Sequence, residues 1–397
     1  MKKHNVLYLN HIGRISGAEI VQMRLVEQLA DTNIHRVGMC PDDGELYPRY
    51  KQVMDVVEPL PMTSNDAGWL SKARDYAASM AAVRWAVRRH KIDLIHANTF
   101  RSALIAAPVG RLMGVPVIWH MHDILKKKLR NSMLVWLYSR LVQAIVCVSD
   151  ATAQGLLRLG AQPEKVQKIY NGVPLSELEA KAASADDVLG KYNGRGPAVV
   201  MVGQITPWKG QDVLLNAMPG ILQKSPKTHF FFVGDGMQNA DRQYKADLQR
   251  QTQANGLDEH VTWLGFRDDV PGIMRQADVI VHCSVYPDPL PTVVLEGMAL
   301  EKVLVASHIG GVAEMVADQE TGYLFSPGDS QNLADKVIEV LENPETRTQM
   351  GRRAGQRIRS LFSMETNVQA IQALYRNVLS APVPWQKRHL HQEAGRL

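Results

Sequence analysis

Two carboxylates bracket the stretch of this chain whose residue types could do chemistry. Asp288 lies in a loop interrupted by three prolines, and Glu296 follows with seven residues between, inside a helix expected from Thr292 onward. An apolar run at 279–281, typical of a buried parallel strand, precedes the loop. Free N–H groups at a helix start after such a strand bind anions. Carboxylates repel phosphate, so two carboxylates beside such a site are expected to accept hydrogen bonds from hydroxyl groups. The stretch therefore predicts a pocket for a ligand with phosphates and hydroxyls, such as a sugar nucleotide. The alternative is an ordinary strand, loop and helix in which Glu296 only complements the helix dipole.

The elements that must position these residues alternate between strands and helices along the chain. In the first half, strands are expected at 6–10, 36–39, 93–96, 115–119 and 144–148, with helices at 18–30, 70–90 and 102–113. In the second half, strands are expected at 198–202, 229–233, 261–264, 279–281, 303–306 and 322–325, with helices at 211–223 and 364–379. This alternation predicts an α/β protein with two doubly wound parallel sheets, whose ligands bind at the carboxyl ends of the strands.

A loose polar segment that ends in Gly-Arg-Gly-Pro at 194–197 predicts a domain boundary. We expect an N-terminal domain at 1–178, a linker at 179–195 and a C-terminal domain at 196–363. Whether the last helix, about 364–380, packs back on the N-terminal domain is left open. Two similar sheets facing each other would enclose an interdomain cleft.

The composition is that of a globular protein long enough for two cores, with 397 residues, 45% hydrophobic and 21% charged. Its three cysteines, Cys40, Cys147 and Cys283, lie far apart, which favours reduced thiols over disulfides or a metal site. We identify no signal peptide and no run approaching the roughly 20 apolar residues of a membrane span. A cytoplasmic location is therefore expected.

Charge is distributed unevenly between the two halves. In residues 1–178, 23 Lys and Arg stand against 15 Asp and Glu, whereas the remainder has 22 against 25. Four of the basic residues lie close together: Lys126, Lys127, Lys128 and Arg130. Apolar residues follow them at helical spacing: Met133, Leu134, Trp136, Leu137 and Leu141. A basic amphipathic segment indicates contact with an anionic membrane surface. A helix packed on the domain, with a solvated basic end, is an alternative of equal weight.

Six short motifs occur in one order along the chain. They are Ser-Gly-Ala-Glu (16–19), Val-Ser-Asp (148–150), Asn-Gly-Val (171–173), Val-Gly-Gln-Ile-Thr-Pro-Trp-Lys-Gly (202–210), the block at 287–299 with both carboxylates, and Gly-Gly-Val-Ala-Glu (310–314). Their order resembles that of the retaining glycosyltransferases of family 4, and the resemblance extends to about residue 380. The resemblance implies the GT-B fold, in which two Rossmann-like domains face each other across a cleft.

The resemblance also implies the residues of the site. The catalytic residues would be His122, close to the transferred sugar, Lys209, which neutralises charge on the leaving diphosphate, and Asp288, near the donor sugar. The donor-binding residues would be Gly17, Gly203, Gln204, Lys209, Gly234, Phe266, Arg267, Leu290, Thr292, Val293 and Glu296, the last on the ribose. Independently of the resemblance, the basic amphipathic pattern leads us to expect residues 126–128 and Arg130 to face the membrane or the acceptor.

The chain departs from the family pattern at three of these positions. Gln204 stands where an arginine is usual, so the diphosphate depends more on Lys209. Asp288 stands where a glutamate is usual and is one methylene shorter. Pro291 replaces a glycine and has no N–H, so that amides such as those of Thr292 and Val293 must bind phosphate. His120, two residues before His122, is expected to point to the other side.

The implied activity is retaining transfer of a hexose from a UDP- or GDP-sugar to an acceptor hydroxyl. The expected acceptor is a glycan or lipid-linked saccharide of cell-envelope polysaccharide or glycolipid synthesis, with peripheral contact to the inner membrane face as an option. No cofactor or nucleic acid is expected. No metal ion is expected either, since the chain has no Asp-x-Asp motif, which is typical of metal-dependent sugar transfer. Alternatives are a GT-B-fold epimerase of sugar nucleotides and a transferase for a small soluble acceptor. An NAD-dependent oxidoreductase is disfavoured, because no Gly-x-Gly-x-x-Gly opens a helix after a strand.

Overall fold

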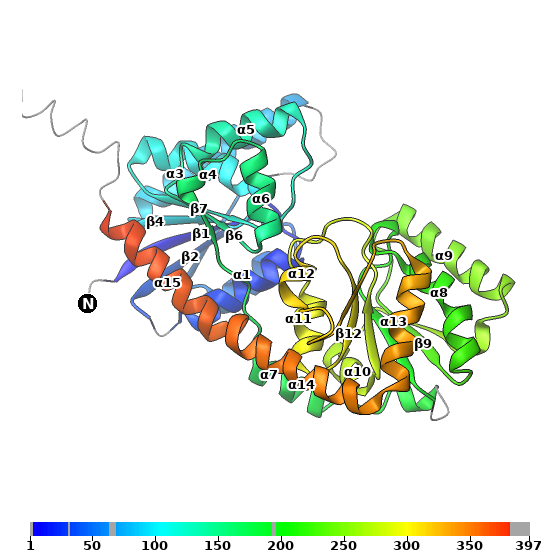
Figure 1. Cartoon of the computed structure of the whole chain (residues 1–397). Helices are drawn as coiled ribbons and strands as arrows, with labels where there is room; N and C mark the ends of the chain where they lie inside the picture. Colours follow the sequence, from blue (N-terminus) through cyan, green and yellow to red (C-terminus); the bar gives the residue numbers. More distant parts are fainter. Residues whose placement is uncertain (1–2, 31, 63–68, 193–195, 382–397) are drawn as a thin grey trace, which may run out of the picture. The chain divides into compact units, whose positions relative to one another are not determined.

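The computed structural model describes residues 3–30, 32–62, 69–192 and 196–381 of a chain that forms two compact units (Figure 1). Met1–Gly172 and Glu365–Leu397 make up the first unit, and Val173–Met364 the second. This division differs from the boundary expected at residue 178, because helix α7 (Leu175–Ala183) packs against α10 (Val270–Gln276). The Gln276 side chain also accepts hydrogen bonds from the amides of Val188 and Leu189. The described part of the expected linker therefore belongs to the second unit.

The first unit is built on a parallel sheet that has seven strands among the described residues. Their order is β3 (Val56–Pro59), β2 (Ile34–Cys40), β1 (His4–Leu9), β4 (Leu94–Ala97), β5 (Val117–Met121), β6 (Ala144–Cys147) and β7 (Val166–Lys168). Its helices are α1 (Gly17–Gln28), α2 (Leu46–Val53), α3 (Trp69–Arg89), α4 (Phe100–Met113), α5 (Leu129–Ser139), α6 (Asp150–Arg158) and α15 (Met364–Ser380).

The second unit repeats this architecture with six parallel strands among the described residues. Their order is β10 (Val261–Gly265), β9 (His229–Val233), β8 (Ala198–Val202), β11 (Val279–His282), β12 (Leu304–Ser307) and β13 (Tyr323–Phe325). Besides α7 and α10, its helices are α8 (Gln211–Lys224), α9 (Asn239–Ala254), α11 (Thr292–Ala299), α12 (Val312–Met315), α13 (Ser330–Glu342) and α14 (Pro344–Leu361).

Strand order reverses once in each sheet, between β1 and β4 and between β8 and β11. Loops on the two sides of such a switch point diverge, which opens a crevice at the carboxyl ends of the strands. Both switch points therefore mark where a ligand is expected.

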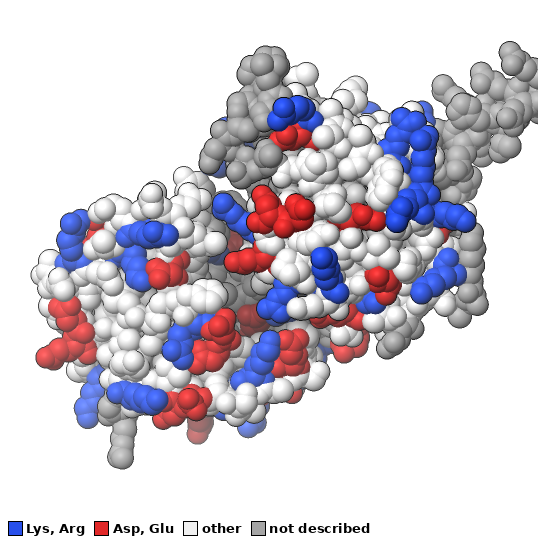
Figure 2. All heavy atoms as spheres, turned by 180° about the vertical axis from the view of Figure 1, so that it is seen from behind, with Lys and Arg blue, Asp and Glu red and all other residues white. Residues whose placement is uncertain are grey.

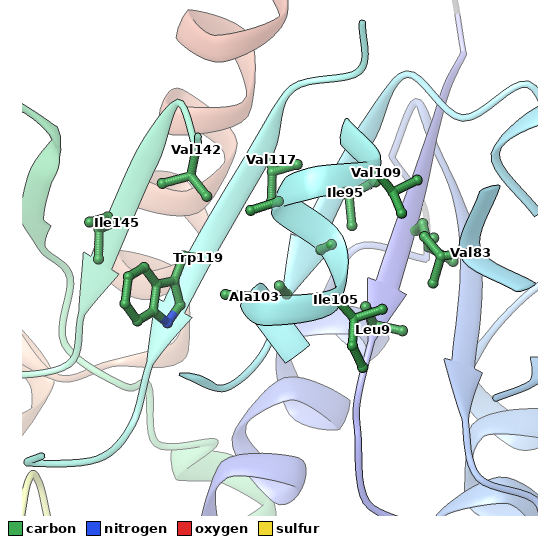
Figure 3. Close-up of a cluster of buried hydrophobic side chains, with 14 of the residues drawn as sticks. Leu9, Val83, Ile95, Ala103, Ile105, Val109, Val117, Trp119, Val142 and Ile145 are labelled. Carbon is green, nitrogen blue, oxygen red and sulfur yellow. The ribbon is translucent and has the colours of Figure 1, made fainter. Parts of the chain in front are cut away.

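The inner strands of the first sheet are buried on both faces, which explains why β4, β5 and β6 are almost continuously apolar. On one face, strand residues such as Leu9, Ile95 and Trp119 pack beneath α3 and α4 in a large cluster (Figure 3). On the other face, Val6 and Tyr8 pack against α1, α2 and α15. Figure 1 shows α15, in red, running along this face of the first unit. The helix whose position the sequence left open thus completes the first core.

Charges on the second unit are largely paired at the surface. Lys336 lies 3.1 Å from Glu339, and Arg347 lies 3.0 Å from Asp278. In Figure 2, Lys and Arg are interspersed with Asp and Glu over the visible part of this unit. Within the described residues, no helix is both long enough and apolar enough to cross a membrane.

Candidate functional site

Three loops, which follow β8, β9 and β10, pack against one another at the carboxyl edge of the second sheet. The Gly203 amide donates to the Val233 carbonyl at 2.9 Å, and the Gly234 amide donates to the Gly265 carbonyl at 2.8 Å. Gly234 has a φ of +131°, and a Cβ there would lie 2.0 Å from the Gly203 carbonyl oxygen. Only glycine fits this approach. Two of the expected donor-binding residues are therefore adjacent, and the packing of the loops explains the glycine at 234.

The loop after β8 also packs against the loop after β11, on the other side of the switch point. Gly210 has a φ of +71°, and a Cβ there would lie 2.1 Å from the Cys283 carbonyl oxygen. The Val285 amide donates to the Trp208 carbonyl at 2.9 Å. This close backbone contact requires glycine at 210. Together with the hydrogen bond from Val285 to Trp208, it holds the loop that carries Lys209 against the loop after β11.

Lys209 and Asp288, from these two loops, meet at the switch point. Lys209 Nζ lies 2.5 Å from Asp288 Oδ2, and the side chains are only 17% and 11% exposed. The same ammonium lies 4.2 Å from the centroid of the Trp208 ring. The fold thus joins an ammonium and a carboxylate that are 79 residues apart in the sequence.

A buried histidine lies on the other flank of this carboxylate. His282 Nε2 lies 3.6 Å from Asp288 Oδ2 and 3.2 Å from Ser284 Oγ. Burial alone would raise the pKa of Asp288, but His282 and the Lys209 charge outweigh it and lower that pKa to about 2. Burial lowers the pKa of His282, so its ring is neutral. Both contacts of the ionised carboxylate use Oδ2, which leaves Oδ1 for a hydroxyl donor.

Helix α11 begins directly after the Asp288 loop. Its N-cap is Pro291, and the first intrahelical donor is the Val294 amide, which reaches the Pro291 carbonyl at 3.1 Å. The amides of Thr292 and Val293 precede that donor and therefore point out of the helix end. Thr292, Val293 and Glu296 are partly exposed. Amide donors and a carboxylate thus lie on the helix that follows the Lys209–Asp288 pair.

The Gly310-Gly311 pair after β12 supports the Asp288 loop from behind. Gly310 has a φ of +64°, and a Cβ there would lie 2.2 Å from the Asp288 carbonyl oxygen. The Gly311 amide donates to that oxygen at 2.9 Å. Leu290, expected as a donor-binding residue, is 5% exposed and anchors the loop in the interior. The late glycine motif therefore fixes the backbone of Asp288.

Two expected donor-binding side chains are bound to aspartates of their own unit. Gln204 Nε2 donates to Asp241 Oδ2 at 2.9 Å. The Arg267 guanidinium pairs with Asp269 through two hydrogen bonds of 2.8 and 2.6 Å. Phe266 is 77% exposed directly after β10. Position 204 therefore supplies no arginine at the switch point, and the Gln204 amide already donates a hydrogen bond to Asp241. Lys209 is the basic side chain that lies there.

In the first unit, His122 follows β5, next to the switch point. Its Nε2 lies 3.2 Å from Asn98 Oδ1, and its ring centroid lies 4.1 Å from that of His120. The expectation that His120 points to the other side is wrong, because residues i and i+2 of a strand share a face. His120 Nδ1 instead meets His96 Nε2 at 3.0 Å in the interior.

Gly17, the expected donor contact of the first unit, is the first residue of α1. Ser16 and Glu19 form the capping box of this helix. A Cβ at position 17 would have no heavy atom within 4 Å, so the packing of the unit does not require glycine there.

Helix α5 exposes most of its apolar residues, whereas two polar residues lie on its buried face. Asn131, Val135 and Ser139 form its buried face. Its exposed face includes Leu129 at 79%, Met133 at 63%, Trp136 at 52% and Leu137 at 45% exposure. Residues 126–128 and Arg130, just before and within the helix start, are exposed as well. The apolar stripe expected from the sequence is thus largely turned away from the domain, with only Leu134 and Leu141 partly buried.

Sequence reasoning missed two polar residues, Asn98 and His282. Each lies at or just after the end of an apolar strand beside a switch point, and that position was the available signal. In the part of the chain that the structure describes, no group of three or more His, Cys, Asp and Glu side chains is placed to hold a metal ion.

Two family models match the chain. Glycosyltransferase Family 4 matches residues 15–177, and Glycosyl transferases group 1 matches residues 189–357. The chain therefore belongs to the glycosyltransferases of family 4, and its two Rossmann-like units have the GT-B fold expected from the motifs.

Relatives of known activity and structure extend this result. The α-D-kanosaminyltransferase of Streptomyces kanamyceticus is 24% identical over 89% of this chain and 98% of that protein. An Escherichia coli α-1,3-galactosyltransferase, which acts between UDP-Gal and α-D-GlcNAc-diphosphoundecaprenol, is 25% identical over 73% of this chain and 76% of that protein. The crystal structure of Anabaena Alr3699/HepE with UDP has a TM-score of 0.83 and 26% identity, covering 95% of this chain and all of that one.

Proposed function

We propose that this chain is a retaining glycosyltransferase that moves a hexose from a UDP-sugar to an acceptor hydroxyl. The observation that carries the proposal is the Lys209–Asp288 pair at the switch point, beside the start of α11. Lys209 neutralises charge that develops on the leaving diphosphate, and the amides of Thr292 and Val293 add donors to it. Asp288 Oδ1 accepts a hydrogen bond from the donor sugar, and Glu296 accepts from the ribose.

The reaction exchanges one C–O bond for another at the anomeric carbon of the donor. The bond to the diphosphate breaks, and the acceptor oxygen bonds from the face that the diphosphate leaves. A diphosphate oxygen takes the proton of the acceptor hydroxyl, so charge and atoms balance without a metal ion or cofactor. His122 lies against the transferred sugar as a hydrogen-bond partner. The choice of UDP is supported by the structural relative, which also binds UDP-glucose.

A thermal-shift panel of UDP, GDP, ADP and their sugars tests the donor. A ligand at 100 times its Kd stabilises by about 2.7 kcal/mol, so UDP and one UDP-sugar should raise the melting temperature most. Retention is tested by the anomeric configuration of the product, measured by NMR. UDP release that requires an acceptor would support transfer, whereas a new sugar nucleotide formed without acceptor would identify an epimerase.

The acceptor is a lipid-linked saccharide that the α5 face brings into reach at an anionic membrane. Leu129, Met133 and Trp136 are exposed on one side of this helix, next to the basic residues at 126–128. Basic residues near an anionic surface contribute about 1 kcal/mol each, and the apolar face adds buried area. The E. coli relative acts on such a lipid-linked acceptor, and the S. kanamyceticus relative is a kanosaminyltransferase. Comparing the rate of transfer to a lipid-linked acceptor with the rate to a short soluble acceptor shows which class of acceptor the protein uses.

A further inference from the structure

Asn98 is the residue whose hydrogen bonds determine how His122 can act. It directly follows β4 and has no exposed surface. Its Nδ2 donates to the Ala18 carbonyl at 3.1 Å and to Asn10 Oδ1 at 3.3 Å. A backbone carbonyl can only accept, so the amide nitrogen must lie on the side of Ala18 and the amide oxygen on the other. The orientation of the Asn98 amide is therefore fixed by its partners.

This orientation decides which nitrogen of His122 carries a proton. Asn98 Oδ1 lies 3.2 Å from His122 Nε2, and an amide oxygen accepts but does not donate. His122 Nε2 must therefore be the N–H. Burial lowers the pKa of His122 to about 3, so the ring is neutral and carries only this proton. Its Nδ1 is then a lone-pair acceptor, and no hydrogen bond within the described residues uses it.

We propose that Asn98 is a positioning residue that holds His122 in the Nε2–H tautomer, so that Nδ1 faces the substrate as a hydrogen-bond acceptor. The inference rests on the proposed function, which places His122 against the transferred sugar. The substrate group that meets Nδ1 must then be a donor, which means a sugar hydroxyl rather than a carbonyl or phosphate oxygen. The choice of tautomer thus becomes a choice of substrate group.

The hydrogen bond from Asn98 to the Ala18 carbonyl also links His122 to the segment around Gly17, the expected donor contact of the first unit. Its partner Ala18 is the residue after Gly17, at the start of α1. On the far side, Asn10 donates to Gln22 Oε1 at 2.7 Å and contacts the Tyr50 hydroxyl. The Tyr50 end of this network provides a control, because it belongs to the same buried network without touching His122.

Three variants separate positioning from stability. Asn98→Leu removes the acceptor for Nε2–H, whereas Asn98→Asp keeps an oxygen there but loses the Nδ2 donors and buries a charge. Turnover of UDP-sugar should fall about 10- to 30-fold in the leucine variant, the cost of leaving the Nε2–H donor without an acceptor. The aspartate variant should stay within about fivefold of wild type although it unfolds at lower urea, because it still accepts from Nε2–H. Tyr50→Phe should lose stability and keep its kcat and KM.

The tautomer itself is read by long-range ¹H–¹⁵N NMR of the histidine rings, with His122→Gln to assign the signals. Wild type should show a protonated Nε2 at His122, and Asn98→Leu a mixture of both tautomers. A protonated Nδ1 in wild type, or equal turnover in the leucine and aspartate variants, would overturn the inference. If wild type transfers no sugar from any UDP-sugar while the NMR result holds, the proposed function fails and the tautomer assignment stands.

Discussion

Replacing Lys209 by methionine should separate the catalytic part of the Lys209–Asp288 pair from its structural part. Methionine keeps the length of the side chain but removes the ammonium that lies 2.5 Å from the carboxylate. Loss of a preorganised charge at a leaving group costs about 10²–10³ in rate, or roughly 3–4 kcal/mol. We therefore expect kcat for UDP-sugar to fall by that factor and UDP to bind more weakly.

The same change should lower stability for a different reason. The Asp288 side chain is 11% exposed, and its pKa is lowered from 3.8 to about 2, which corresponds to roughly 2 kcal/mol in favour of the ionised carboxylate. Lys209 supplies part of this, so Lys209→Met leaves the charge poorly compensated. Adding Asp288→Asn removes that charge, and the double variant should recover most of the lost stability. It should not recover turnover.

Both quantities are measured on the same purified proteins, as urea unfolding of the second unit and as UDP released with acceptor. Lys302→Met is the matched control. Lys302 is also a partly buried lysine of this unit, but its Nζ binds the Ala277 carbonyl at 3.0 Å, at the opposite edge of the sheet. If the double variant regains turnover together with stability, Lys209 only neutralises Asp288 and has no role at the diphosphate.

The remaining predictions concern the ribose, metal ions, pH and the membrane. Glu296→Gln should weaken UDP binding about tenfold by calorimetry while 2′,3′-dideoxy-UDP binds both proteins alike; equal UDP affinities would remove Glu296 from the ribose. Activity should survive excess EDTA, and a loss that magnesium or manganese restores would contradict the diphosphate scheme. Because the folded-state pKa of Asp288 is lowered to about 2, its stabilisation is complete above about pH 4 and is lost as the pH falls towards 2. Asp288→Asn should therefore lose less stability than wild type between pH 5 and 2, and parallel losses would refute this. Wild type should float with anionic vesicles, less so at high salt, and changing the lysines at 126–128 to glutamate should release it, whereas Lys91→Glu should not. If the wild-type protein does not float with anionic vesicles at low salt, the proposed contact between the α5 face and the membrane is wrong.

Much of the fold could be predicted because parallel strands that are covered on both faces appear in the sequence as continuous apolar runs. The strands β4, β8 and β11 were all located to within about two residues by this pattern. The edge strands β3 (Val56–Pro59) and β7 (Val166–Lys168) were missed, because each is short and none of its residues is fully buried. Most of helix α7 fell within the expected linker, because its polar sequence gives no sign of its packing against α10.

The site could be predicted in part, where a motif carried it. The motifs identified Lys209 and Asp288, but not that the Lys209 ammonium contacts the Asp288 carboxylate, since that depends on the backbone contact between Gly210 and Cys283. They also could not show that the Gln204 amide donates a hydrogen bond to Asp241. Asn98 carries no motif, and only the adjacency of β1, β4 and β5 reveals what it does.

The packing of α15 on the first sheet makes the order of synthesis matter. Residues 173–364 must leave the ribosome before α15 can cover the face formed by Val6 and Tyr8. Four side chains of α15, Ile371, Leu374, Tyr375 and Val378, are buried there, and side chains of this kind contribute about 1.5–3 kcal/mol each. Until they arrive, α1 and α2 cover only part of this apolar face, and the area that α15 will cover stays open. The first unit to be translated is thus the last to be completed.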